Sequence, residues 1–225
     1  MERRHAAENT NEPGGSTLAV MLLYGGIWGL VEATLGFLLH LIPRFAPVPP
    51  LAGMVLFPVG VLFMLAAVQA AGKPVAAAGV AVVAAAIKAS SALLAPIPWF
   101  FVQNPVFSIL LEGLVVWGFV AAFAFQRYSA RTFPLALGAA VSWRLLFIAV
   151  HVVFGIQWGL LARGVPAVLQ FVLLDSLVNG ALITALLSLS LPSKLSTPTA
   201  FLLRPLPLGA VLTLAVMAEY ITSIV

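Results

Sequence analysis

Long apolar stretches, separated by short breaks rich in proline, glycine or charge, occupy almost the whole chain. A membrane-spanning helix needs about 20 predominantly apolar residues, and seven stretches reach that length. They are residues 17–41, 51–71, 75–95, 106–125, 133–155, 165–189 and 206–225. The pattern predicts an all-α bundle of six to seven transmembrane helices, with six if the short last stretch does not span.

The polar residues outside these stretches predict a simple domain organisation. Residues 1–15 form a polar tail that carries Arg3 and Arg4, and residues 16–225 form a single transmembrane domain. The tail resembles the charged front of a signal peptide. The apolar run behind it is too long for a signal peptide and has no obvious small-residue cleavage site, so we expect a retained first helix.

Composition supports a membrane protein. Hydrophobic residues make up 62% of the chain and charged residues 8%, whereas a soluble domain has about a quarter charged residues. We therefore expect membrane lipids to be its main surroundings. There is no cysteine, which excludes disulfides and thiolate metal sites. The net charge of +4 is no sign of nucleic-acid binding, because the basic residues are scattered singly through the loops.

The basic residues predict the orientation in the membrane. Seven of them lie on the side of the N-terminal tail, and two lie on the opposite side. The first group is Arg3, Arg4, Lys73, Arg127, Arg131, Lys194 and Arg204, and the second is Arg44 and Arg163. Under the positive-inside rule, this bias predicts a multi-pass protein of the cell membrane with a cytoplasmic N-terminus.

Seven ionisable residues fall inside the predicted spans, where a charge costs about 2.5–3.5 kcal/mol or more. They are Glu32, Lys88, Glu112, Arg144, His151, Asp175 and Glu219. At about 1.5 Å of rise per residue, none is clearly confined to the cytoplasmic half. We therefore expect Glu32, Glu112, Arg144 and Asp175 to line one polar pocket in the outer half.

Further side chains are expected to complete this solute-binding site. Trp28 shares a helix face with Glu32, and Asn179 shares one with Asp175. His151 lies two turns from Arg144. Trp99 and Asn104 belong to residues 96–105, which are predicted as an outer loop that closes over a ligand.

Each of these residues also has a simpler explanation. Trp99 can belong to an interfacial aromatic belt. Lys88 and Glu219 can extend towards the outer interface. Arg144 can form a structural ion pair with Glu112 or Asp175, and His151 can be a hydrogen-bonded packing residue.

Catalytic motifs are missing from the sequence. The zinc-protease pattern His-Glu-x-x-His and the P-loop are both absent. Ser142, Arg144 and His151 resemble a lipid-phosphatase pattern only faintly, because the spacing differs and Gly155 stands where an acid is needed. We therefore expect no enzyme activity, no catalytic residue, no metal site and no cofactor.

Gly25, Gly29 and Ala33 form a row of small residues at four-residue spacing on the first predicted helix. Small residues in such a row let another helix approach closely. That helix can belong to this bundle or to a partner protein. We expect a partner, since the adjacent face of the helix is expected to line the pocket.

The chain resembles the substrate-binding S components of energy-coupling factor transporters. The likeness is in size, the cytoplasmic N-terminus, the long outer loop at residues 42–50, the small-residue row, and the stretch 104–113. It implies uptake of a small, vitamin-like solute together with a separate coupling membrane subunit and its ATPases. In that family, such a row on the first helix contacts the coupling subunit.

Other functions stay open on the sequence alone. One alternative is an intramembrane enzyme or an assembly scaffold that works on lipid-like substrates. Another is a stand-alone carrier that is coupled to an ion gradient.

Overall fold

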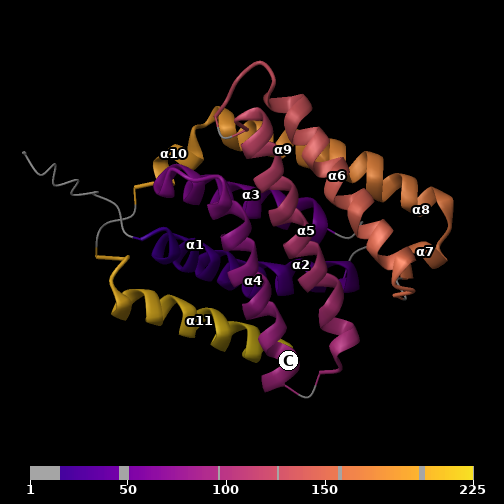
Figure 1. Ribbon diagram of the computed structural model, residues 1–225. Helices are drawn as coiled ribbons and strands as arrows, with labels where there is room; N and C mark the ends of the chain where they lie inside the picture. Colours follow the sequence, from indigo (N-terminus) through magenta and orange to yellow (C-terminus); the bar gives the residue numbers. More distant parts are fainter. Residues whose placement is uncertain are drawn as a thin grey trace, which may run out of the picture.

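The computed structural model describes residues 16–45, 51–95, 97–125, 127–156, 159–197 and 201–224. The predicted tail 1–15 and residues 46–50 of the predicted outer loop 42–50 lie outside the described residues, whereas residues 42–45 of that loop are helical. This part of the chain consists of helices and short connections and contains no strand. In chain order its elements are α1 (Thr17–Val31), the π-helix η1 (Glu32–Gly36), α2 (Phe37–Phe45), α3 (Ala52–Ala71), α4 (Val75–Leu94), α5 (Trp99–Phe123), α6 (Thr132–Val153), α7 (Gly159–Ala162), α8 (Val165–Leu169), the π-helix η2 (Gln170–Leu174), α9 (Asp175–Ser188), α10 (Leu191–Leu195) and α11 (Pro205–Ile224) (Figure 1).

Seven helical stretches of the described chain are long and apolar enough to cross a membrane. The first joins α1, η1 and α2, and the sixth joins α8, η2 and α9. This confirms the predicted all-α bundle, with seven candidate spans in the described chain. The seventh stretch, α11, has a mean hydropathy of 1.5, the lowest of the seven.

The fourth spanning helix begins earlier than predicted. Residues 99–105 were expected to be part of a loop, but α5 starts at Trp99 and contains Pro105. Proline removes one backbone hydrogen bond, yet the remaining backbone groups of a helix in lipid still have to bond within the helix. Asn104 is therefore on a helix wall and not on a loop above the site.

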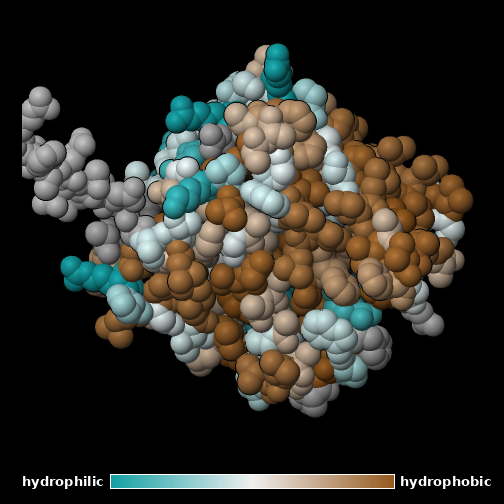
Figure 2. Space-filling model, viewed as in Figure 1, coloured by the Kyte–Doolittle hydropathy of each residue, from teal (hydrophilic) through white to brown (hydrophobic). Residues whose placement is uncertain are grey.

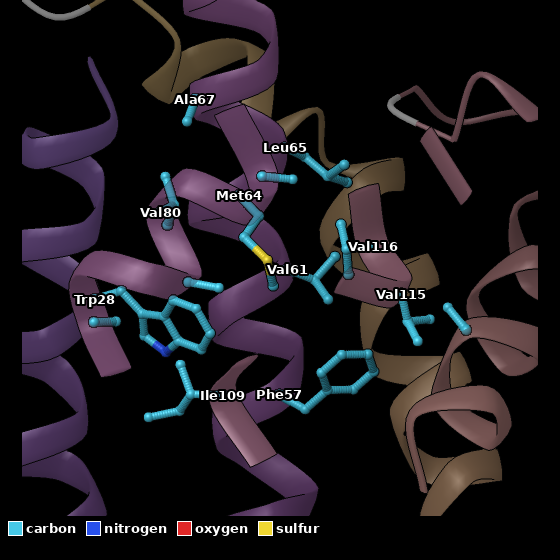
Figure 3. Close-up of a cluster of buried hydrophobic side chains, with 14 of the residues drawn as sticks. Trp28, Phe57, Val61, Met64, Leu65, Ala67, Val80, Ile109, Val115 and Val116 are labelled. Atoms are coloured by element: carbon cyan, nitrogen blue, oxygen red, sulfur yellow. The ribbon is translucent and has the colours of Figure 1, made fainter. Parts of the chain in front are cut away.

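Small residues hold the centre of the bundle together. The buried face of α4 contains Ala77, Ala81 and Ala84, and a Cβ added at Gly113 of α5 would lie 2.1 Å from the Cβ of Ala81. Such faces let helix backbones approach closely, which is how helices associate in lipid. Larger side chains, including Trp28, fill the space between α1, α3 and α5 (Figure 3).

The outer helices complete the bundle. α11 lies beside α1, and α6 packs against α9 (Figure 1). The short α10 is tied to α1 by the Tyr24 hydroxyl, which donates to the carbonyl of Leu195.

The surface of the described chain is apolar over wide areas. Leu93 and Leu206 are 86% and 85% exposed, and brown apolar residues cover α6 and α8 in Figure 2, whereas teal polar residues gather around α10. Large exposed apolar areas mark surfaces that meet something other than water. With seven spanning helices, lipid is that surrounding.

The orientation of the bundle gives a first testable prediction. Lys73 and Lys194 lie at the same end of the bundle, and Arg163 lies at the other. Because the chain has no cysteine, one introduced at each site is unique. We expect an impermeant thiol reagent to label Arg163→Cys in intact cells and to label Lys73→Cys and Lys194→Cys only after lysis. The reverse pattern would contradict the predicted cytoplasmic N-terminus.

Candidate functional site

The bundle contains a partly open cavity of about 480 Å³. All seven spanning stretches contribute to its walls, and the sixth does so through the π-helix η2. The lining residues are Glu32, Ala33, Gly36, Phe37, Ala52, Gly53, Leu56, Lys88, Phe101, Asn104, Pro105, Ser108, Glu112, Trp143, Phe147, Phe171, Thr222 and Ser223. Ligand-binding cavities in proteins commonly measure about 300–1,000 Å³, so this volume suits a small molecule.

The cavity lies in one half of the bundle. Ala52 is at the start of α3, Lys88 is in the last third of α4, and Ser223 is near the end of α11. The opposite ends of α3 and α4 meet at the turn that contains Lys73, and the opposite end of α11 follows Arg204. The cavity therefore extends from the middle of the bundle, where Glu112 and Trp143 lie, away from the basic loops and towards the side expected to face outwards.

Two carboxylates belong to the cavity wall. Glu32 opens the π-helix η1, and Glu112 is on α5. Glu112 is 5% exposed, and its Oε1 accepts a hydrogen bond of 2.9 Å from Ser108. Within the described part of the chain, neither carboxylate has an ion-pair partner. These two residues were predicted for the pocket, and both lie in it.

An ion pair joins α4 to α11 at the cavity. Lys88 Nζ lies 2.9 Å from Glu219 Oε1 and 3.2 Å from Glu219 Oε2, and Ser223 donates to Oε1 over 3.4 Å. Glu219 is 1% exposed, so it does not extend to the interface as its simpler explanation assumed. Lys88 lines the cavity, and sequence analysis did not include it in the site.

Arg144 lies behind the cavity wall and is completely buried. Its guanidinium donates to Asn179 Oδ1 over 2.5 Å, to Ser176 Oγ over 3.3 Å, and to backbone carbonyls of α3 and α6. It also lies 4.5 Å from the ring centre of Trp143. Among the described residues, Arg144 hydrogen-bonds to neutral groups. The expected ion pairs with Glu112 and Asp175 are not formed within 4.0 Å.

Asp175 and Asn179 continue this buried network on α9. The Asn179 side-chain amide donates to the carbonyl of Met54 over 2.6 Å, which links α9 to α3. Asp175 interacts electrostatically with Arg144, and its Oδ1 is buried without a hydrogen bond within the described chain. Arg144, Asp175 and Asn179 were predicted to line the pocket, but they are absent from its lining. Of the three, Arg144 contacts wall residues from behind, through the rings of Trp143 and Phe171.

His151 holds one wall residue in place. Its Nδ1 is 2.8 Å from the carbonyl of Phe147, and its Nε2 is 2.9 Å from Oδ1 of Asn104. His151 is thus a hydrogen-bonded packing residue, which fixes the Asn104 side chain at the cavity wall.

The two tryptophans that sequence analysis singled out lie elsewhere. Trp28 is completely buried in the core, where its ring would contact any Cβ added at Gly60 of α3. Trp99 is 47% exposed at the start of α5, as an interfacial aromatic residue would be. Neither residue lines the cavity.

The small-residue row faces the interior of the same bundle. Gly25 and Gly29 are buried, and a Cβ added at Gly29 would lie 2.6 Å from Ile87 Cδ1 of α4. Ala33 is 1% exposed and lines the cavity. Helix α4 covers Gly25 and Gly29, so these two positions present no face to a partner helix in the described structure. This corrects the expected docking role, because internal packing uses the same close approach.

The sequence placed one aromatic wall residue near the ligand, Phe101 in the predicted loop 96–105, and gave no sign of the others. Phe37, Phe101, Trp143, Phe147 and Phe171 line the cavity. Trp143 packs edge-on against Phe147 and Phe171. Aromatic residues are common in transmembrane helices, so nothing in the sequence separates the other four from ring side chains that face lipid.

Both π-helices of the described chain border the cavity. η1 supplies Glu32, Ala33 and Gly36, and η2 supplies Phe171. Single π-helical turns are rare within α-helices and are frequent at functional sites. This is independent support for a functional role of the cavity.

The His, Asp and Glu side chains of the described residues form no group of three that could hold a metal ion. The fold and the site define a polytopic helical membrane protein with a polar, aromatic-walled cavity in one half of the bundle. The chain matches no protein-family model, no curated protein and no solved structure.

Proposed function

We propose that this protein is the solute-binding membrane subunit of an uptake system. It takes a small, vitamin-like solute from the side opposite the basic loops and works with a separate, ATP-driven coupling complex. The observation that carries the proposal is the cavity of about 480 Å³, with charged and aromatic walls, in the half of the bundle expected to face outwards.

Two further points support a binding subunit over a pump or an enzyme. The sequence contains no P-loop, so energy from ATP would have to come from another protein. We also expect the solute to leave unchanged, since no catalytic motif accompanies the cavity. In the S components of energy-coupling factor transporters, which the chain resembles, one protein likewise binds the solute and others hydrolyse ATP. Here the surface for such a partner would lie elsewhere than the Gly25–Gly29–Ala33 row.

Filling the cavity tests the proposal. Both Gly53 and Gly118 of α5 have open space where a Cβ would be added, with nothing within 4 Å. Gly53 lines the cavity and Gly118 does not. We expect mass spectrometry of protein purified in mild detergent to detect a bound solute in the parent and in Gly118→Phe, and none in Gly53→Phe. Equal solute in both variants, or a chemically altered solute, would contradict the proposal.

The ionisable groups in the cavity favour a second candidate, a stand-alone carrier coupled to an ion gradient. Glu32, Lys88 and Glu219 lie in or beside one membrane-embedded cavity, and such groups form proton pathways in transporters. Reconstitution of the chain alone in liposomes distinguishes the two. Concentrative uptake driven by a proton gradient would establish the carrier, and its absence would favour the subunit.

A further inference from the structure

The charges on the cavity wall do not balance. Glu32, Glu112 and Lys88 are the charged residues that line it. Lys88 is already paired with Glu219 at 2.9 Å, so its charge is compensated outside the lining. Among the described residues, neither Glu32 nor Glu112 therefore has a cation within ion-pair distance, and Lys88 interacts with Glu32 only at longer range.

Arg144 forms no ion pair with either carboxylate and interacts with Glu112 only at longer range. It is absent from the lining, and it donates to Asn179, Ser176 and backbone carbonyls behind the wall. The rings of Trp143 and Phe171, which do line the cavity, lie against its guanidinium at 4.5 and 5.1 Å. Its charge is thus engaged by a separate buried network.

Uncompensated carboxylates in a low-dielectric interior are costly. A positively charged ligand relieves that cost, whereas an anionic ligand increases it. The aromatic rings of the wall favour the same sign of charge, because the face of an aromatic ring attracts cations. The apolar part of the wall, including Phe37 and Phe101, suits a ligand with a hydrophobic group.

We propose that the solute is a small organic cation, an amine that carries an aromatic or apolar group, bound through Glu32 and Glu112. This inference rests on the proposed solute-binding function and names the class of its substrate. The ammonium group pairs with the two carboxylates, and the apolar group lies against the phenylalanine rings.

Three probes of one shape test the charge preference on the unmodified protein. They are phenethylamine as the cation, 2-phenylethanol as the neutral form and 3-phenylpropanoate as the anion. Calorimetry in detergent at neutral pH should show phenethylamine binding about tenfold or more tighter than the alcohol, since one desolvated charge pair exceeds 1.4 kcal/mol. The anion should not bind measurably. Equal affinities, preference for another probe, or no binding of phenethylamine would overturn the inference.

Amide variants locate the charge that is responsible. Glu112→Gln and Glu32→Gln should each weaken phenethylamine binding about tenfold or more and leave 2-phenylethanol unaffected, which also shows that the cavity is intact. The matched control is Asp175→Asn, which removes an intramembrane carboxylate that does not line the cavity. It should change neither affinity by more than about twofold. An equal loss in all three variants would overturn the assignment to Glu32 and Glu112.

Failure of this inference is distinguishable from failure of the proposed function. A neutral or anionic solute that co-purifies with the parent and is lost in Gly53→Phe would refute the organic cation and leave the binding subunit standing. Absence of any co-purified solute, together with no binding of the three probes, would refute both.

Discussion

Leucine at position 29 should destabilise the folded bundle by about 3 kcal/mol, the upper part of the range for overpacking. A Cβ at Gly29 would already lie 2.6 Å from Ile87 Cδ1 and 3.2 Å from Ile87 Cβ. The larger side chain would have to push α1 and α4 apart. Gly25→Leu should cost at least as much, because its Cβ would meet the backbone oxygen of Val80 at 2.9 Å, which cannot rotate away.

Thermal unfolding in detergent, followed by gel filtration, measures this effect. The matched control is Gly118→Leu, where an added Cβ has nothing within 4 Å, and it should unfold at the temperature of the parent. If Gly29→Leu were as stable as the parent but lost a co-purifying partner, the row would be a docking surface after all.

Replacing Arg144 with methionine should cost about 3–5 kcal/mol, as expected when one member of a buried charged network is removed. The side chain is 0% exposed and connects α3, α6 and α9 through its hydrogen bonds. Without it, Asn179 Oδ1 would lose its donor and Asp175 its nearby positive charge.

The yield and melting temperature of purified Arg144→Met report this loss, and Arg163→Met in an exposed turn is the control. Arg144→Lys should restore little of the lost stability, since one ammonium group cannot reach the acceptors on three helices at once. A stable Arg144→Met variant that loses only solute binding would instead place Arg144 in the binding site.

The spans could be predicted from sequence because their signal is length and hydropathy alone. Pro105 shows the limit of reading breaks from residue type. It looked like a loop residue, but the requirement to bond backbone groups within a helix outweighed its missing N–H. The π-helices were not predicted, since no residue pattern in 32–36 or 170–174 marks them.

The site could be predicted only in part, for a physical reason. In lipid both the inner and the outer faces of a helix are apolar, so the sequence does not show how each helix is rotated. Glu32 and Glu112 were found because charge in a span is costly. The aromatic wall and the packing of Gly29 against Ile87 gave no such signal, because apolar side chains suit either face.

The Lys88–Glu219 pair constrains how the protein is made. The two residues are 131 positions apart, so ribosome and translocon deliver α4 to the bilayer long before α11 emerges. Lys88 enters the membrane without its partner, and α11, the least hydrophobic of the spans, carries a carboxylate that is costly to insert alone. Docking on α4 compensates both charges at once. We therefore expect insertion of α11 to close the cavity wall as well, because Thr222 and Ser223 of α11 line it.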